Sequence, residues 1–125
     1  FHTYVPREEL GLLLSLSDVG LVCLLGGQEG LSVPSKTFGL MAAGVPVLGV
    51  MSEHSEIARV IREEKCGKVI QPGDSHALAD AIVEFCTDEA KRKLAAQRGI
   101  DAIRGKYNLH RAAQKYKELI ETLPR

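Results

Sequence analysis

Three runs of apolar residues divide the chain and predict the strands of one sheet. The longest covers residues 19–25 (VGLVCLL), and shorter runs follow at residues 45–50 and 68–70. A continuous apolar run, without alternation of polar and apolar positions, is typical of a strand buried on both faces of a parallel sheet. We therefore expect three buried strands at these positions.

Helical patterns fill the segments between these runs. Proline, serine and aspartate mark the expected helix starts, and glycine marks the expected ends. The first predicted helix begins at Pro6, and the second begins at Pro34 or Ser35 and ends at Gly44. The third begins at Glu56 after a Ser55 cap, reaches about Lys65 and is stopped by Gly67. The fourth begins at Asp74 or Ser75, and the chain is helical again from Asp88 with a break near Asn108. Their apolar stripes include Leu10, Leu13, Leu14 and Leu16 in the first helix, and Leu78, Ala81, Ile82 and Phe85 in the fourth.

Alternation of helix and strand defines the expected fold class, an α/β domain with part of a doubly wound, Rossmann-like parallel sheet and helices on both faces. Three strands are few for such a sheet. The chain starts at Phe1, without a Met, and residues 1–4 resemble the end of a strand. We expect a fragment whose domain has its first strands upstream.

Composition narrows the function classes. The 125 residues are 45% hydrophobic and 26% charged, with zero formal net charge and no Trp. Neutral charge and few aromatics argue against a nucleic-acid partner. No apolar run is long enough to span a membrane, and no signal peptide is present.

Cysteine usage indicates a reducing compartment, which favours a cytoplasmic location. Cys23, Cys66 and Cys86 are odd in number and widely spaced, so neither a disulfide framework nor a zinc site is expected. We interpret Cys23 and Cys86 as inert core residues. The histidines are scattered and form no metal constellation, so no metal is predicted.

Two segments lie where an open α/β sheet binds ligands, beyond the carboxyl ends of its strands. They cover residues 26–36 and 51–56. The first leads into a helix whose start carries Ser35, Lys36 and Thr37, and a helix start suits phosphate. A Lys there opposes the helix dipole at a cost of about 0.3–1 kcal/mol, which bound phosphate would reverse. The alternative is a solvated Lys36 and a merely capping Ser35.

Three further polar residues in these segments have both a functional and an ordinary interpretation. Glu29, among glycines, could accept hydrogen bonds from sugar hydroxyls, or be a surface carboxylate. His54 could act as a general base, or be an exposed loop histidine. Glu56 could belong to the site, or be an acidic residue in a capping turn.

Several sequence blocks resemble retaining glycosyltransferases of the GT4 class, which have the GT-B fold. The stretch at residues 40–48 (LMAAGVPVL) is similar to the family's "EAMAAGxPVI" joint between helix and strand. The other similar blocks, in the family's order, lie at residues 1–9, 17–19, 55–58, 64–67, 71–74 and 106–108. Residues 33–37 (VPSKT) resemble a subgroup that makes bacterial surface polysaccharides.

The resemblance implies transfer of a sugar from a nucleotide diphosphate-sugar to an acceptor hydroxyl, with retention and without a cofactor. Ser35, Lys36 and the N–H groups of Thr37 and Phe38 would hold the phosphates, and Glu29 and Gly30 the sugar. The implied donor site comprises Glu29, Gly30, Leu31, Ser35, Lys36, Thr37, Phe38 and Gly39, with His54 and Glu56 as further candidates. One departure is Gly39, which stands where the family has a ribose-binding glutamate.

The resemblance also implies what the chain lacks. Residues 1–125 would be the C-terminal part of the nucleotide-sugar-binding domain, without its first strands and without the N-terminal domain that binds a saccharide or lipid-linked saccharide acceptor. The whole enzyme would be cytoplasmic, peripheral to the inner membrane through its other parts. The fragment alone would be inactive, and the exposed edge of its first full strand would favour self-association.

Two alternatives remain open from the residues. The first is a non-catalytic donor-binding subunit of a split transferase, for which Gly39 would mark a degenerate site. The second is a sugar-nucleotide epimerase of the same fold, for which Glu53 and His54 are the available acid–base groups.

Overall fold

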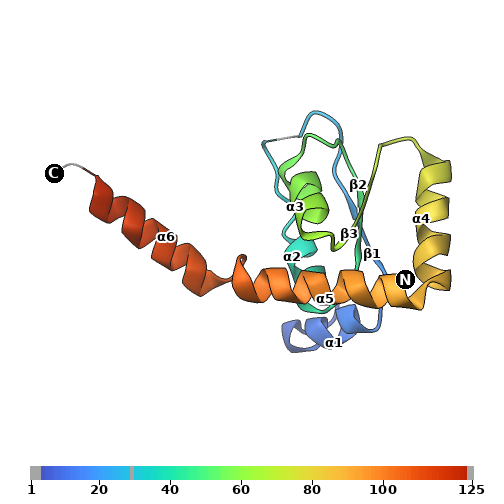
Figure 1. The fold of residues 1–125 in the computed structure, drawn as a ribbon, viewed down its shortest axis with the longest axis horizontal. Coiled ribbons are helices and arrows are strands. Elements are labelled where there is room, and N and C mark those ends of the chain that lie inside the picture. The colour runs from blue at the N-terminus through green and yellow to red at the C-terminus, as the bar shows by residue number, and fades with distance from the viewer. Residues whose placement is uncertain (1–3, 29, 124–125) are drawn as a thin grey trace.

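The computed structural model describes residues 4–28 and 30–123 and contains a three-stranded parallel sheet (Figure 1). The strands β1 (Gly20–Cys23), β2 (Val47–Val50) and β3 (Gly67–Ile70) lie in the order β1-β2-β3. Gly20 pairs with Val47, and Val47 pairs with Gly67, so the three strands begin and end in register. The predicted parallel sheet is confirmed: β1 and β2 are shorter than predicted by one or two residues at an end, and β3 begins one residue earlier.

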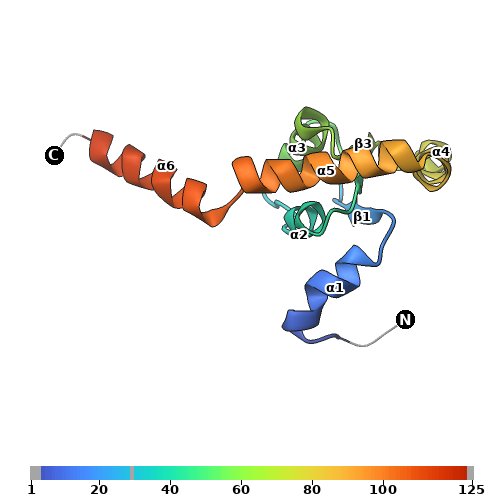
Figure 2. The same cartoon turned by 60° about the horizontal axis from the view of Figure 1, so that its bottom comes forward.

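Helices cover both faces of the sheet, as predicted. On one face α2 (Lys36–Ala42) and α3 (Glu56–Glu64) pack on the strands, and on the other lies α4 (Ser75–Thr87) (Figures 1 and 2). Helix α5 (Glu89–Gly105) packs against α2 and α4 and crosses the end of the sheet where the strands begin (Figure 1). Two apolar clusters form the core, one per face. The first is centred on Leu40, Met41, Val47, Ile57 and Ile61, and the second on Leu48, Ile70, Ala81 and Phe85.

Side-chain caps start the helices where the sequence predicts them. Ser55 accepts a hydrogen bond from the Ala58 amide at 3.2 Å, and Asp74 accepts one from Ala77 at 2.9 Å. Asp88 caps α5 in the same way, and Asn108 caps α6 (Leu109–Thr122). The predicted break near Asn108 is therefore confirmed. Each such cap stabilises its helix by about 1 kcal/mol.

Two glycines act at the ends of helices α2 and α3, in different ways. Gly44 follows α2 with φ of 72°, which confirms it as the C-cap glycine. Helix α3, by contrast, ends at Lys65, which itself adopts the left-handed conformation with φ of 52°. Gly67, expected to stop this helix, instead begins β3. A Cβ there would lie 1.8 Å from the Val47 carbonyl oxygen, so close strand contact requires glycine.

Burial differs from the sequence predictions in several places. In the stripe predicted for the first helix, Leu10, Leu13 and Leu16 are exposed, and Leu14 packs partly buried against the first apolar cluster. Neither the 3-10 turn Arg7–Glu9 nor α1 (Leu10–Ser15) has a fully buried residue. Ile82, predicted for the stripe of the fourth helix, is exposed too. Strand β1 is buried on one face only, because Leu21 and Cys23 are exposed. Cys86 is exposed as well, although Cys66 is buried.

The two ends of the described chain lie outside the packed core. Tyr4 is exposed and outside any strand, and the rest of the strand expected at residues 1–4 lies outside the described residues. Helix α6 buries no residue and leads away from the sheet (Figures 1 and 2). Its apolar residues, among them Tyr116, Leu119 and Ile120, are exposed.

Candidate functional site

The candidate site lies at the carboxyl edge of the sheet, where β1, β2 and β3 end level with one another. Register pairs Cys23 with Val50 and Val50 with Ile70 at this edge. The segments at residues 24–35, 51–55 and 71–74 leave the strands here. The topology therefore brings both predicted site segments to one edge, which is where open α/β sheets bind their ligands.

Lys36, the first residue of α2, reaches back to β1. Its Nζ donates a hydrogen bond to the Leu21 carbonyl oxygen at 3.2 Å. The Gly20 amide donates to Pro46, directly before β2, and the Leu24 amide donates to Val50 in β2, so the backbone of the intervening Leu21 faces the outer edge of β1. The Lys36 ammonium thus lies beside the outer edge of β1.

The backbone amides at the start of α2, which the sequence analysis assigns to phosphate binding, already form hydrogen bonds within the chain. The Thr37 amide donates to Pro34 at 3.2 Å, and the Phe38 amide donates to Ser35 at 3.1 Å. Ser35 makes this possible because its backbone is already helical, with φ of −62° and ψ of −23°, and its side chain forms no capping bond. These two amides would have to leave their carbonyl partners to bind phosphate, so Ser35 and Lys36 are the better candidates.

Thr37 is buried at the start of α2. It is completely buried, and its hydroxyl is a buried side-chain polar atom without a hydrogen-bond partner among the described residues. A buried unsatisfied hydroxyl costs about 1–3 kcal/mol. Because no solvent reaches this oxygen, the Thr37 side chain packs inside the fold and presents no hydroxyl to the candidate site.

The predicted sugar-binding residues lie in the loop between β1 and α2. Glu29 lies outside the described residues. Gly30 has φ of 78°, a left-handed conformation that favours glycine, and Leu31 is exposed. Gly39 lies inside α2, half-buried, and a Cβ there would meet only Leu14 at 3.6 Å. The position expected to carry glutamate therefore has room for a side chain.

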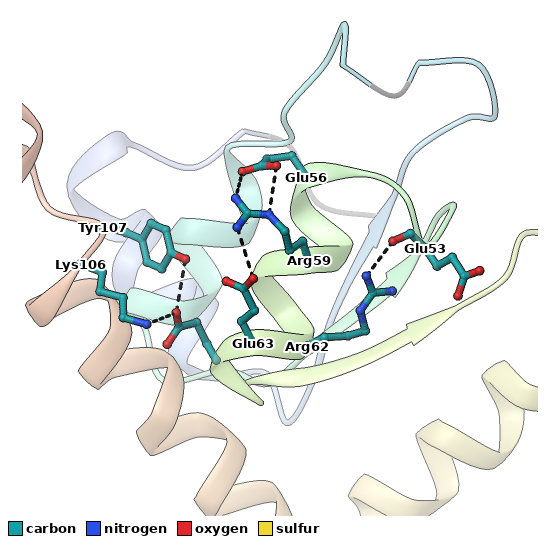
Figure 3. Close-up of polar contacts among 8 residues, drawn as sticks. Glu53, Glu56, Arg59, Arg62, Glu63, Lys106 and Tyr107 are labelled. Atoms are coloured by element: carbon teal, nitrogen blue, oxygen red, sulfur yellow. Dashed lines mark hydrogen bonds and ion pairs between the residues drawn. The ribbon is translucent and has the colours of Figure 1, made fainter.

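His54 and Glu53 lie together in the loop after β2. The His54 Nε2 lies 3.9 Å from the Glu53 carboxylate, and the His54 amide donates to the Ser52 hydroxyl at 3.3 Å. Arg62 holds the loop by donating to the Glu53 carbonyl at 2.8 Å (Figure 3). The side chains of His54 and Glu53 are 84% and 58% exposed, so both groups are open to solvent, as the interpretation of His54 as an exposed loop histidine expects.

Glu56 belongs to an ion-pair network on α3. Figure 3 shows Arg59 between Glu56 and Glu63, with an Arg59–Glu63 distance of 3.2 Å. The hydrogen bond from Arg59 lowers the pKa of Glu56, so this carboxylate stays ionised. Farther along, Lys106 and Tyr107 both donate to Glu64, Lys106 at 2.7 Å (Figure 3). Glu56 is thus engaged by its own helix, which fits its ordinary interpretation.

A hollow that the sequence analysis missed lies at the same edge. It has a volume of about 190 Å³ and is lined by Val50, Gln71, Gly73, Asp74, Ser75 and Leu78. The available signal is the Pro72-Gly73-Asp74 turn directly after a buried strand. Asp74 is already committed to capping α4, which leaves Gln71 and Ser75 as the polar groups for a ligand.

The described residues offer neither a metal cluster nor a membrane span. No group of three or more His, Cys, Asp and Glu side chains within residues 4–28 and 30–123 could hold a metal ion. Nor does any helix in that part of the chain have the length and apolar character needed to cross a bilayer.

A parallel sheet covered by helices on both faces, with its candidate groups at the carboxyl edge, defines a doubly wound α/β domain. The chain belongs to the family described as glycosyl transferases group 1, whose model matches residues 1–88. This match confirms the family that the sequence motifs resemble.

Curated relatives agree with this assignment. WbjE of Pseudomonas aeruginosa, named a probable glycosyltransferase, is 44% identical over 82 residues, which are 66% of this chain and 20% of that protein. The amylovoran biosynthesis glycosyltransferase AmsK of Erwinia amylovora is 30% identical over 96% of this chain and 30% of its own length. A phosphatidyl-myo-inositol mannosyltransferase of Mycobacterium leprae is 29% identical over 93% of this chain and 32% of its own. The chain thus spans between a fifth and a third of these relatives.

Proposed function

We propose that the chain is the C-terminal part of the donor-binding domain of a retaining glycosyltransferase. The complete enzyme moves a sugar from a nucleotide diphosphate-sugar to an acceptor hydroxyl. The observation that carries the proposal is Lys36, a cation at the start of α2 that follows the loop from β1 and lies beside the outer edge of that strand, in a chain of the group 1 family. Its first strands and an acceptor-binding N-terminal domain lie outside these 125 residues.

The chemistry at this edge is electrostatic. Transfer leaves a nucleoside diphosphate, and a preorganised cation stabilises the charge that develops on it. Lys36 supplies that charge and Ser35 a hydroxyl, while Glu29, Gly30 and Leu31 in the preceding loop contact the sugar. Lys36 binds the Leu21 carbonyl in the absence of donor and exchanges this partner for a phosphate oxygen.

The names of the relatives and the cysteine content support our proposals for the acceptor and the location. AmsK is named for amylovoran biosynthesis, and the mannosyltransferase is named for a phosphatidyl-inositol lipid. A saccharide or lipid-linked saccharide acceptor, used in polysaccharide or glycoconjugate synthesis, fits both names. The odd, unpaired cysteines fit a cytoplasmic enzyme, peripheral to the inner membrane through its other parts.

Calorimetric titration of the complete transferase tests the role of Lys36. A charge-assisted hydrogen bond contributes about 1.5–3 kcal/mol, so Lys36→Met should weaken nucleoside diphosphate binding by roughly ten- to a hundredfold. Free nucleoside, which lacks phosphate, should bind variant and wild type alike. Lys117→Met, an exposed lysine of α6, serves as the matched control.

Two outcomes would overturn this role. An equal loss for nucleoside and nucleoside diphosphate would make Lys36 a support of the loop. No loss for either ligand would make it a solvated surface lysine.

A further inference from the structure

A second charged site lies at the opposite end of the sheet, where the strands begin. A hollow of about 220 Å³ opens between the start of β3, helix α4 and helix α5. Its lining residues are Lys65, Gly67, Lys68, Phe85, Lys91, Leu94, Ala95 and Arg98. At about 30 Å³ per water molecule in the liquid, it has room for a small polyatomic ion.

The charge of this hollow is one-sided. Glu84 forms ion pairs with both Lys68 and Lys91, and it is the carboxylate that touches the lining cations. Lys65 and Arg98 form no ion pair within the described residues. Four cations against one carboxylate leave a surplus of three positive charges, although the whole chain is neutral. The rest of the lining is apolar, and a surplus of positive charge around such a hollow attracts counter-ions.

The backbone builds this hollow. Lys65 is the one non-glycine residue with positive φ in the described chain, at a helix C-terminus where glycine is the usual choice. Gly67 lies so close to β2 that a Cβ would collide with the Val47 backbone, which fixes the start of β3 against its neighbour. Phe85 and Ala95, both buried, close the inner wall. The left-handed position thus places a cation among the residues that line the hollow.

Helix α5 completes the opposite wall. Lys91, Leu94 and Arg98 follow one another at spacings of three and four residues, so they share one side of the helix. The wall therefore combines two cations with an exposed leucine between them.

We propose that this hollow binds a phosphate-type anion, carried either by a free phosphate compound or by an anionic lipid headgroup. The site is separate from the donor site, because it lies at the amino ends of the strands. Lys65 and Arg98 hold the anion directly, and Lys68 and Lys91 divide their charge between it and Glu84. A phosphate group accepts the several charge-assisted hydrogen bonds that such a ring of cations offers.

The test is a titration of the 125-residue chain with inorganic phosphate at constant ionic strength, followed by amide NMR. We expect saturable shifts at Gly67, Lys68 and Ala95. The double variant Lys65→Gln/Arg98→Gln should bind at least about tenfold more weakly, since each lost charge-assisted bond is worth about a factor of ten. The matched control Arg104→Gln/Lys117→Gln removes two exposed cations elsewhere and should bind like wild type.

Glu84→Gln tests the direction of the charge effect. It frees Lys68 and Lys91 from their carboxylate partner, so phosphate should bind more tightly than to wild type. Cosedimentation with phosphatidylglycerol vesicles, against phosphatidylcholine vesicles, distinguishes the two sources of the anion. Vesicle binding that the double variant loses and the control keeps assigns a lipid headgroup, and phosphate binding without vesicle binding assigns a free phosphate compound.

Three results would overturn the proposal. The first is binding of neither phosphate nor vesicles. The second is equal weakening in the double variant and in its control, which would show a general charge effect. The third is weaker phosphate binding by Glu84→Gln, since only a structural role of the ion pairs predicts that loss.

Discussion

Strands β1 and β2 are neighbours of equal length and apolar composition, yet their surroundings differ. In β2, Val47 and Leu48 are 0% and 1% exposed, because α2 and α3 cover one face and α4 the other. In β1, Val22 is buried but Leu21 is 46% exposed, and no strand pairs with the outer edge of β1 among residues 4–28 and 30–123, where the Leu21 carbonyl accepts a hydrogen bond from Lys36. An apolar run therefore predicts that a segment forms a strand, whereas the elements that pack on this strand determine how much of its surface is buried.

The largest expected effect of this contrast is a change in oligomeric state. An apolar face beside an unpaired strand edge invites pairing between chains. We expect the 125-residue chain to self-associate in sedimentation at about 100 µM, within the usual range for exposed edges. Leu21→Lys should shift the chain toward monomer, whereas Ile120→Lys, on the exposed face of α6, should not. Monomeric wild type, or dissociation by the α6 variant alone, would contradict the assignment to β1.

Stability should show the same contrast in a pair of truncations. Leu48→Ala removes a fully buried side chain of β2 and should cost about 2–5 kcal/mol of unfolding free energy. Leu21→Ala removes a half-exposed side chain of β1 and should cost less than about 1 kcal/mol. Urea unfolding in dilute solution measures both. Equal losses would mean that the open face of β1 is covered in solution.

The fold was predictable because its signals are local. Apolar runs located all three strands, and the caps Ser55, Asp74 and Asn108 lie where the sequence places them. Burial was less predictable, since the exposed stripe of α1 and the open face of β1 depend on elements that pack against them. Local patterns specify which face of an element is apolar and say nothing of what covers it.

The position of the two loop segments was predictable, but the contacts of their residues were not. The strand-to-helix loops indicated the carboxyl edge, where the register of the strands brings them together, whereas the Lys36 ammonium lies at Leu21, beside the outer edge of β1. The hydrogen bonds that already occupy the Thr37 and Phe38 amides depend on the helical backbone of Ser35, which its residue type does not reveal. The cation-lined hollow is formed by Lys65, which follows α3, and by residues of β3, α4 and α5. Because these residues are far apart in the sequence, no contiguous motif predicts the hollow.

The cysteines also differ in their surroundings: Cys23 in β1 is exposed, whereas Cys66, directly before β3, is buried. Burial raises the pKa of the Cys66 thiol to about 11, from an ordinary value of 9.0. Between these pH values the unfolded chain releases the proton while the folded chain retains it. Stability should therefore be intact below pH 9 and fall by about 2–3 kcal/mol as the pH rises to 11. Urea unfolding across this range should show the loss in wild type and a smaller one in Cys66→Ala. Equal slopes would assign the loss to other groups.

The smallest expected effect concerns Gly39, in the helix that lies against β1 and β2. Glycine inside a helix costs about 0.5–1 kcal/mol relative to alanine, and a side chain here would meet only Leu14 at 3.6 Å. Gly39→Glu and Gly39→Gln should therefore both stabilise the chain by about 0.5 kcal/mol in urea unfolding. Only the glutamate supplies the ribose-binding carboxylate that the sequence resemblance implies at this position, so only Gly39→Glu should tighten nucleoside binding in the complete transferase. Equal nucleoside affinity of the two variants would show that a carboxylate at position 39 does not reach the ribose. Destabilisation by both variants would show that the packing around this face of α2 leaves no room for a longer side chain.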